Sequence, residues 1–117
     1  MISHVLLAAM IAAPAMPSSP VGGGNPTQAR KALASCLNDA VKADLDAKTA
    51  PPAFQTKLST LCANEKAAYK AASVSADLAG GIKRAVAEQN ASMDVDDVVQ
   101  STIDRYKDFF ESNTKPR

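Results

Sequence analysis

The sequence predicts an all-α protein built on a disulfide-stapled antiparallel helical hairpin. After Pro26, apolar residues recur every three or four positions, which is the spacing of an amphipathic helix, and no apolar–polar alternation typical of a strand occurs. The only two cysteines, Cys36 and Cys62, lie almost equally far from a proline-containing break at residues 49–52. Two antiparallel helices joined at this break would bring the two sulfur atoms together.

Length and composition limit the number of domains and the class of partner. A chain of 117 residues has room for one small domain. Its 13 basic and 12 acidic side chains are mixed along the chain, which argues against a nucleic-acid-binding surface or a polybasic membrane patch. Aromatic residues make up only 4%, so the core must come mainly from Leu, Val, Ile and Ala and should be thin. A thin core benefits from a covalent cross-link, which favours a bonded cysteine pair.

An uninterrupted apolar run, VLLAAMIAA, occupies residues 5–13. As a helix this run would span only about 14 Å, roughly half of the hydrocarbon core of a bilayer, so it is too short for a transmembrane helix. Its length matches the apolar part of a secretory signal peptide, and the small residues that precede Met16 suit a signal peptidase. The sequence therefore predicts a signal peptide over residues 1–15, with cleavage between Ala15 and Met16.

Export is the expected consequence of this signal. The mature protein would be periplasmic or secreted, with no stable insertion in the membrane after the signal is removed. Residues 16–25, rich in Pro, Ser and Gly, are expected to form a flexible leader. Residues 1–4 contain no Lys or Arg, so two alternatives stay open: an atypical or incomplete signal, and a buried or disordered segment in an unexported protein.

The predicted hairpin covers residues 26–79 of a single helical domain, residues 26–112. The pair Asn25–Pro26 offers an N-cap and a favourable first helical residue. The pair Pro51–Pro52 should end the first helix near Lys48 and start the second, because a residue that precedes proline is biased toward extended backbone.

The cysteines are expected in the middle of the two hairpin helices, beside the leucines of the inward-facing stripes. Closing a loop of about 26 residues with a Cys36–Cys62 bond should contribute about 3 to 4 kcal/mol in the chain-entropy model. On the first helix, Asp44 and Lys48 are four residues apart, in the order that supports a solvated helix.

One or two C-terminal helices, over residues 82–112, should fold back on the hairpin. Gly80–Gly81 marks a break, because consecutive glycines are costly inside a helix. A third helical segment is expected from Ile82 to about Ala91. The acidic run Asp94–Asp97 is typical of a helix start and predicts a separate last helix ending at Ser112, followed by a frayed tail over residues 113–117.

The sequence predicts no catalytic, cofactor-binding or metal site. Cys36 and Cys62 could be a structural disulfide, two free thiols, or a redox or metal pair; a redox pair usually stands near a helix N-terminus, and zinc needs about four ligands. No histidine follows His4, which removes the commonest general base and metal ligand. The run Asp94–Asp97 lacks the glycine and glutamate of a calcium loop. The structural disulfide is the preferred interpretation, and an enzyme is only a remote alternative.

The aromatic cluster Tyr106, Phe109 and Phe110 near the C-terminus has two interpretations. It could anchor the last helix on the hairpin, or it could form an exposed patch that binds a partner. The function hypothesis that follows is a non-catalytic protein-binding module with an unknown protein partner. Thin alanine-rich faces leave the oligomeric state open.

The alternative hypothesis is a periplasmic acid- or envelope-stress chaperone. The predicted architecture resembles that of small helical periplasmic chaperones with a single helix-linking disulfide, although their motifs, including LTxxQ, are absent. Protonation of the 12 carboxylates would make the nearly neutral chain strongly positive, which could trigger partial opening.

Overall fold

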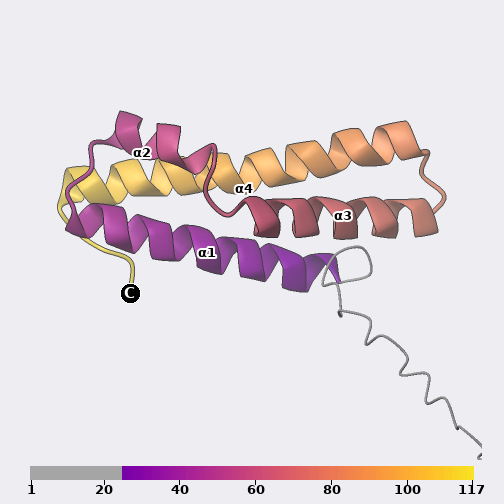
Figure 1. The fold of residues 1–117 in the computed structure, drawn as a ribbon, viewed down its shortest axis with the longest axis horizontal. Helices are drawn as coiled ribbons and strands as arrows, with labels where there is room; N and C mark the ends of the chain where they lie inside the picture. The colour runs from indigo at the N-terminus through magenta and orange to yellow at the C-terminus, as the bar shows by residue number, and fades with distance from the viewer. Residues whose placement is uncertain (1–24) are drawn as a thin grey trace, which may run out of the picture.

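The computed structural model describes residues 25–117, which fold into four helices with no strand among them (Figure 1). These are α1 Pro26–Asp46, α2 Pro51–Leu58, α3 Ala63–Ala79 and α4 Arg84–Ser112. The all-α prediction is therefore confirmed for this part of the chain. The predicted signal peptide over residues 1–15, its cleavage site between Ala15 and Met16, and the leader up to residue 24 lie outside the described residues.

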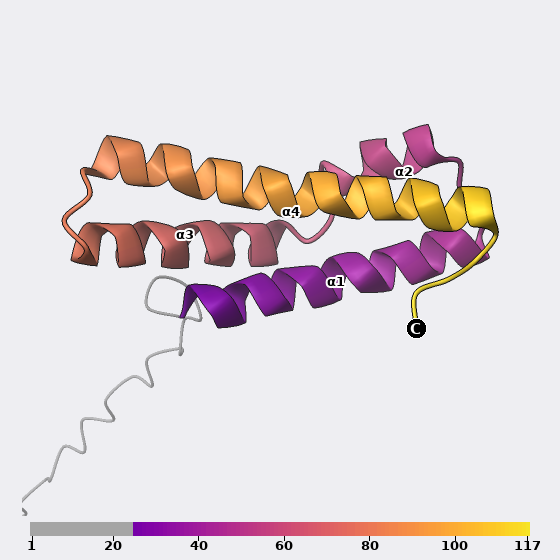
Figure 2. The same cartoon turned by 180° about the vertical axis from the view of Figure 1, so that it is seen from behind.

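The longest helix, α4, contacts each of the other three helices. In both ribbon views α3 lies along the N-terminal half of α4, while α1 and α2 lie along its C-terminal half (Figures 1 and 2). α3 and α4 run in opposite directions, and so do α1 and α3. Because α1 begins beside the middle of α3, one end of the helical region consists of α3 and α4 alone.

The first helix begins as the sequence predicts. The side chain of Asn25 accepts a hydrogen bond from the backbone N–H of Thr27 at 2.8 Å, and Pro26 is the first helical residue. The helix ends at Asp46, and Lys48 then adopts a left-handed backbone conformation with a φ of 54°. One face of α1 is buried along its length by Leu33, Leu37, Val41 and Leu45.

The second half of the predicted hairpin differs from the prediction, because it is broken into α2 and α3. The hydroxyls of Ser59 and Thr60 bond to the carbonyl oxygens of Thr56 and Lys57, at 2.7 and 3.2 Å, and so satisfy backbone groups that a continuing helix would use. Cys62 then takes a left-handed conformation, with a φ of 57°, immediately before α3. As a result α2 packs against α4, and it is α3 that lies beside α1.

The C-terminal region is one continuous helix, so the separate last helix predicted from the run Asp94–Asp97 does not form. Gly81, with a φ of 87°, makes the turn between α3 and α4 as expected. The run Asp94–Asp97 does not start a new helix but lies within α4. No Gly or Pro interrupts residues 84–112, and Ala91 and Val98, on either side of the run, are both buried, so packing carries the helix through it.

The core is uneven along the molecule. Where α1, α2 and α4 meet, the fully buried side chains are large: Leu33, Leu37, Val41, Phe54, Leu58 and Tyr106. Where α3 meets α4, the buried hydrophobic residues include Ala72, Ala87 and Ala91, which let the helices approach closely but bury little area. The thin core expected from the composition is therefore concentrated at the α3–α4 end.

Candidate functional site

The aromatic cluster predicted at the C-terminus is divided between the core and the surface. Tyr106 is fully buried, and its ring stacks on Phe54 of α2 with centroids 3.8 Å apart and planes at 13°. Phe109 is half-buried and packs against the core. Phe110 lies 6.2 Å from Tyr106 between ring centroids and is 38% exposed. Tyr106 therefore anchors α4, and Phe110 is the member of the cluster that a partner could reach.

A hollow of about 190 Å³ lies beside Phe110, between the C-terminal ends of α1 and α4. Its apolar wall is formed by Leu45, Phe109 and Phe110, and Lys48 stands at its edge. The rest of the lining is the segment Asn113–Lys115, which follows α4. An apolar wall with an adjacent ammonium group suits a single apolar side chain that has a carboxylate nearby.

The segment after α4 is attached to the end of α1. Asn113 adopts a left-handed conformation with a φ of 55°, and the N–H of Thr114 bonds to the carbonyl of Phe109 at 3.0 Å. The ammonium of Lys115 pairs with the carboxylate of Asp46. These contacts place the segment across one side of the hollow.

A buried polar network lies next to the hollow. The carboxylate of Asp44, only 4% exposed, accepts hydrogen bonds at 2.8 Å from the hydroxyl of Thr49 and from the ammonium of Lys57. The hydroxyl of Tyr106 donates to the backbone carbonyl of Thr49. Burial raises the pKa of Tyr106, and the negative charge of Asp44 raises it further. The network joins α1, α2 and α4 at one point and holds the aromatic stack in place.

This network was not expected from the sequence, which suggested an interaction of Asp44 with Lys48. The left-handed conformation of Lys48 takes that residue out of α1, so the helical i,i+4 geometry is lost. Lys57, thirteen residues away in α2, takes its place. No local pattern signals this pair, because it depends on how α2 folds back.

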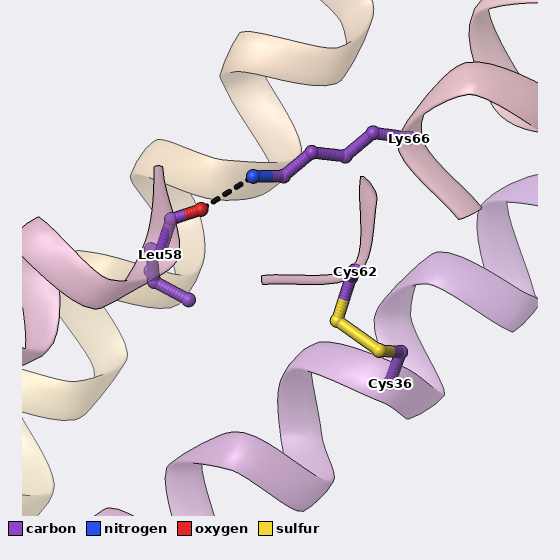
Figure 3. The surroundings of a disulfide bond; sticks show 4 residues. All are labelled: Cys36, Leu58, Cys62 and Lys66. Atoms are coloured by element: carbon purple, nitrogen blue, oxygen red, sulfur yellow. Dashed lines mark hydrogen bonds between the residues drawn. A yellow bond between two sulfur atoms is a disulfide. The ribbon is translucent and has the colours of Figure 1, made fainter. Parts of the chain in front are cut away.

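The predicted cysteine pair lies at disulfide bonding distance. The sulfur atoms of Cys36 and Cys62 are 2.04 Å apart and their Cα atoms 6.0 Å apart (Figure 3). Cys36 is in the middle of α1 as expected, but Cys62 is the N-cap of α3 and not a mid-helix residue. The bond therefore joins α1 to the break between α2 and α3.

Two charged side chains lie near this disulfide. Lys66, one turn into α3, extends toward α2 and donates to the carbonyl of Leu58 (Figure 3). Burial lowers the pKa of Lys66, and the charge of Asp96 partly opposes that shift. Glu65 has a carboxylate oxygen within 4.8 Å of both sulfur atoms, but bonded sulfurs are not the thiolates that bind metals.

Comparison of the chain with protein-family models, with curated proteins and with solved structures finds no match. Within residues 25–117, no helix combines the length and the apolar character needed to cross a bilayer. On its geometry, the candidate site consists of the hollow beside Phe110 together with the adjacent aromatic stack and polar network.

Proposed function

We propose that the protein is a small exported, non-catalytic module that binds another protein through the hollow beside Phe110. The observation that carries this proposal is the partial exposure of Phe110 in the apolar wall of the hollow, beside Tyr106 of the buried Phe54–Tyr106 stack. A rigid aromatic side chain next to a hollow is a common anchor in protein interfaces, because it contributes contact area at a small entropic cost.

The chemistry of the hollow defines the partner. Its wall favours an apolar side chain, and Lys48 at its edge favours a neighbouring Asp or Glu of the partner. Export rests on the apolar run at residues 5–13, and the Cys36–Cys62 bond is compatible with an oxidising compartment, where disulfides mainly persist. The partner would then be a periplasmic or extracellular protein with an exposed apolar–acidic segment.

The test is capture of the partner from the native host followed by measurement of its affinity for two variants. Phe110→Ala should weaken binding at least about 30-fold, which corresponds to about 2 kcal/mol for an interface anchor. Met93→Ala is the matched control, because Met93 is 51% exposed on α4 but lies outside the hollow. Equal binding by the native protein and by Phe110→Ala would rule out the hollow as the binding site.

The second candidate function is a chaperone that opens in acid, and the Asp44 network favours it. The ion pair of Asp44 with Lys57 is the salt bridge that joins α2 to α1 in residues 25–117, and its loss would free α2 from α1. α2 has only eight residues, and its release from α4 would expose Phe54 and Leu58. The opened protein would then offer an apolar surface to unfolded clients.

Dye binding and suppression of client aggregation at about pH 2 to 3 test this alternative. Asp44→Asn, which removes the charge at every pH, should shift opening to higher pH. A protein that stays closed and inactive in acid is not such a chaperone. The two functions also differ in capture experiments, where a binding module retains one stoichiometric partner and a chaperone retains many weak ones.

A further inference from the structure

Within residues 25–117, α3 has a second apolar face that is only partly covered. Its first face, with Tyr69, Ala72 and Ser73, is buried. The second face, here called the outer stripe, consists of Ala67, Ala71, Val74 and Leu78. These four residues line an open hollow of about 550 Å³ together with Lys70, Ser75, Arg84 and Glu88.

The spacing of the outer stripe is that of a coiled-coil seam. Successive members are four, three and four residues apart, so they follow one line along the helix. The line is symmetric in sequence: Ala67 and Leu78 are equally far from the midpoint between residues 72 and 73, and so are Ala71 and Val74. A second α3 that runs antiparallel would therefore place Leu78 against Ala67 and Val74 against Ala71. Each large side chain would meet a small one, as interdigitated packing requires.

The charges beside the stripe are complementary to themselves in the same arrangement. Lys70 and Asp77 flank the stripe on the same side and are two turns apart. In the antiparallel pair, Lys70 of each copy would lie near Asp77 of the other, so two opposite-charge pairs would form. Lys70 has no carboxylate within salt-bridge distance in residues 25–117, and Asp77 uses one oxygen for a long 3.4 Å contact with Asn90.

We propose that the outer stripe of α3 binds a second copy of this chain in the antiparallel orientation, about a two-fold axis near residues 72 and 73. The two α3–α4 pairs would then form one four-helix arrangement. The end of each protomer that consists of α3 and α4 alone would pack against the other protomer (Figure 1). This surface is separate from the hollow beside Phe110, so the dimer does not depend on the proposed function.

The dimer should be weak. The stripe is only about 18 Å long, and two of its four residues are alanines, so the buried area falls short of the roughly 800 Å² per partner of a standard interface. We expect association in the range of about 10 to 300 μM, measurable by sedimentation of the oxidised full chain over about 5 to 500 μM.

Two matched variants locate the interface. Ala71→Glu places a charge at the centre of the seam and should weaken association at least about 10-fold. Ala43→Glu introduces the same charge on the exposed side of α1, away from the stripe, and should leave association unchanged. Circular dichroism should show that the helices are intact in both variants.

A charge exchange then tests the orientation. Lys70→Asp alone and Asp77→Lys alone each bring like charges together and should weaken association, whereas the double variant Lys70→Asp/Asp77→Lys should restore it. The proposal is overturned if the native protein stays monomeric throughout the range, if Ala71→Glu associates as well as the native protein, if Ala43→Glu is equally impaired, or if the double variant is no better than the single ones.

Discussion

Removal of the disulfide should destabilise the protein by an amount set mainly by the loop it closes. The Cys36–Cys62 bond closes a loop with a sequence separation of 26. The chain-entropy relation gives about 3.5 kcal/mol for such a loop at 25 °C. We therefore expect Cys36→Ala/Cys62→Ala to lose about 3 to 4 kcal/mol of unfolding free energy, a large part of the 5 to 15 kcal/mol typical of small domains.

A second double variant separates the loop effect from the backbone at Cys62. Because Cys62 has a φ of 57°, an alanine there keeps the steric cost of the left-handed conformation, and a glycine does not. Cys36→Ala/Cys62→Gly should therefore be about 1 kcal/mol more stable than the double alanine variant. A mid-helix Cys62 would give the opposite order, because glycine in a helix interior is less stable than alanine by about 1 kcal/mol.

Urea unfolding followed by circular dichroism measures both differences. The slope of free energy against urea should rise in both variants, because the unfolded chain without the cross-link exposes more surface. A loss of less than about 1 kcal/mol in the double alanine variant would contradict the loop-closure effect. An alanine variant as stable as the glycine variant, or more stable, would contradict the left-handed conformation of residue 62.

Three further predictions concern the network and the N-terminus. Tyr106→Phe should lower the free energy of unfolding by about 1 kcal/mol, because it removes the hydrogen bond to Thr49. Since the pKa of Tyr106 is raised in the folded state, the unfolded state loses this proton first, and the native protein should lose stability above about pH 10; the variant should lose less. Urea unfolding as a function of pH measures both effects. Lys57→Met should cost about 1 to 3 kcal/mol, because it leaves Asp44 buried without its cation, and the added change Asp44→Asn should recover part of that loss in the same assay. The intact mass of the native protein should equal that of a chain that starts at Met16 and lacks two hydrogen atoms relative to its reduced form. A full-length mass with two alkylatable thiols would contradict both export and the disulfide.

The features that the sequence predicts well are those with local causes. The start of α1 follows from Asn25 and Pro26, and the turn before α4 follows from the glycine pair, because caps and left-handed turns need particular residues at particular positions. The cysteine pairing is also predictable, since the break at residues 49–52 turns the chain back on itself, although Cys62 is the N-cap of α3 and not a mid-helix residue. The same local signals identify the aromatic cluster, but they do not show which of its members is exposed.

The features that the sequence misses depend on contacts between distant segments. Asp94–Asp97 has the composition of a helix start, yet burial of Ala91 and Val98 in one face carries α4 through it. Residues 59–62 have no Gly or Pro to mark a break, and the stack of Phe54 on Tyr106 draws α2 away from α1. The partner of Asp44 was missed for the same reason, because it comes from α2 once that helix has turned.

The contrast between the two ends of the molecule links the disulfide to the proposed dimer. Large side chains hold α1, α2 and α4 together. By contrast, α3 meets α4 largely through small residues and is cross-linked to α1 by the Cys36–Cys62 disulfide. On the outer stripe, the small side chains of Ala67 and Ala71 would let a second α3 approach closely enough for Val74 and Leu78 to pack. Association should therefore protect α3 from local unfolding most strongly in the variants without the disulfide, where α3 keeps only its packing against α1 and α4.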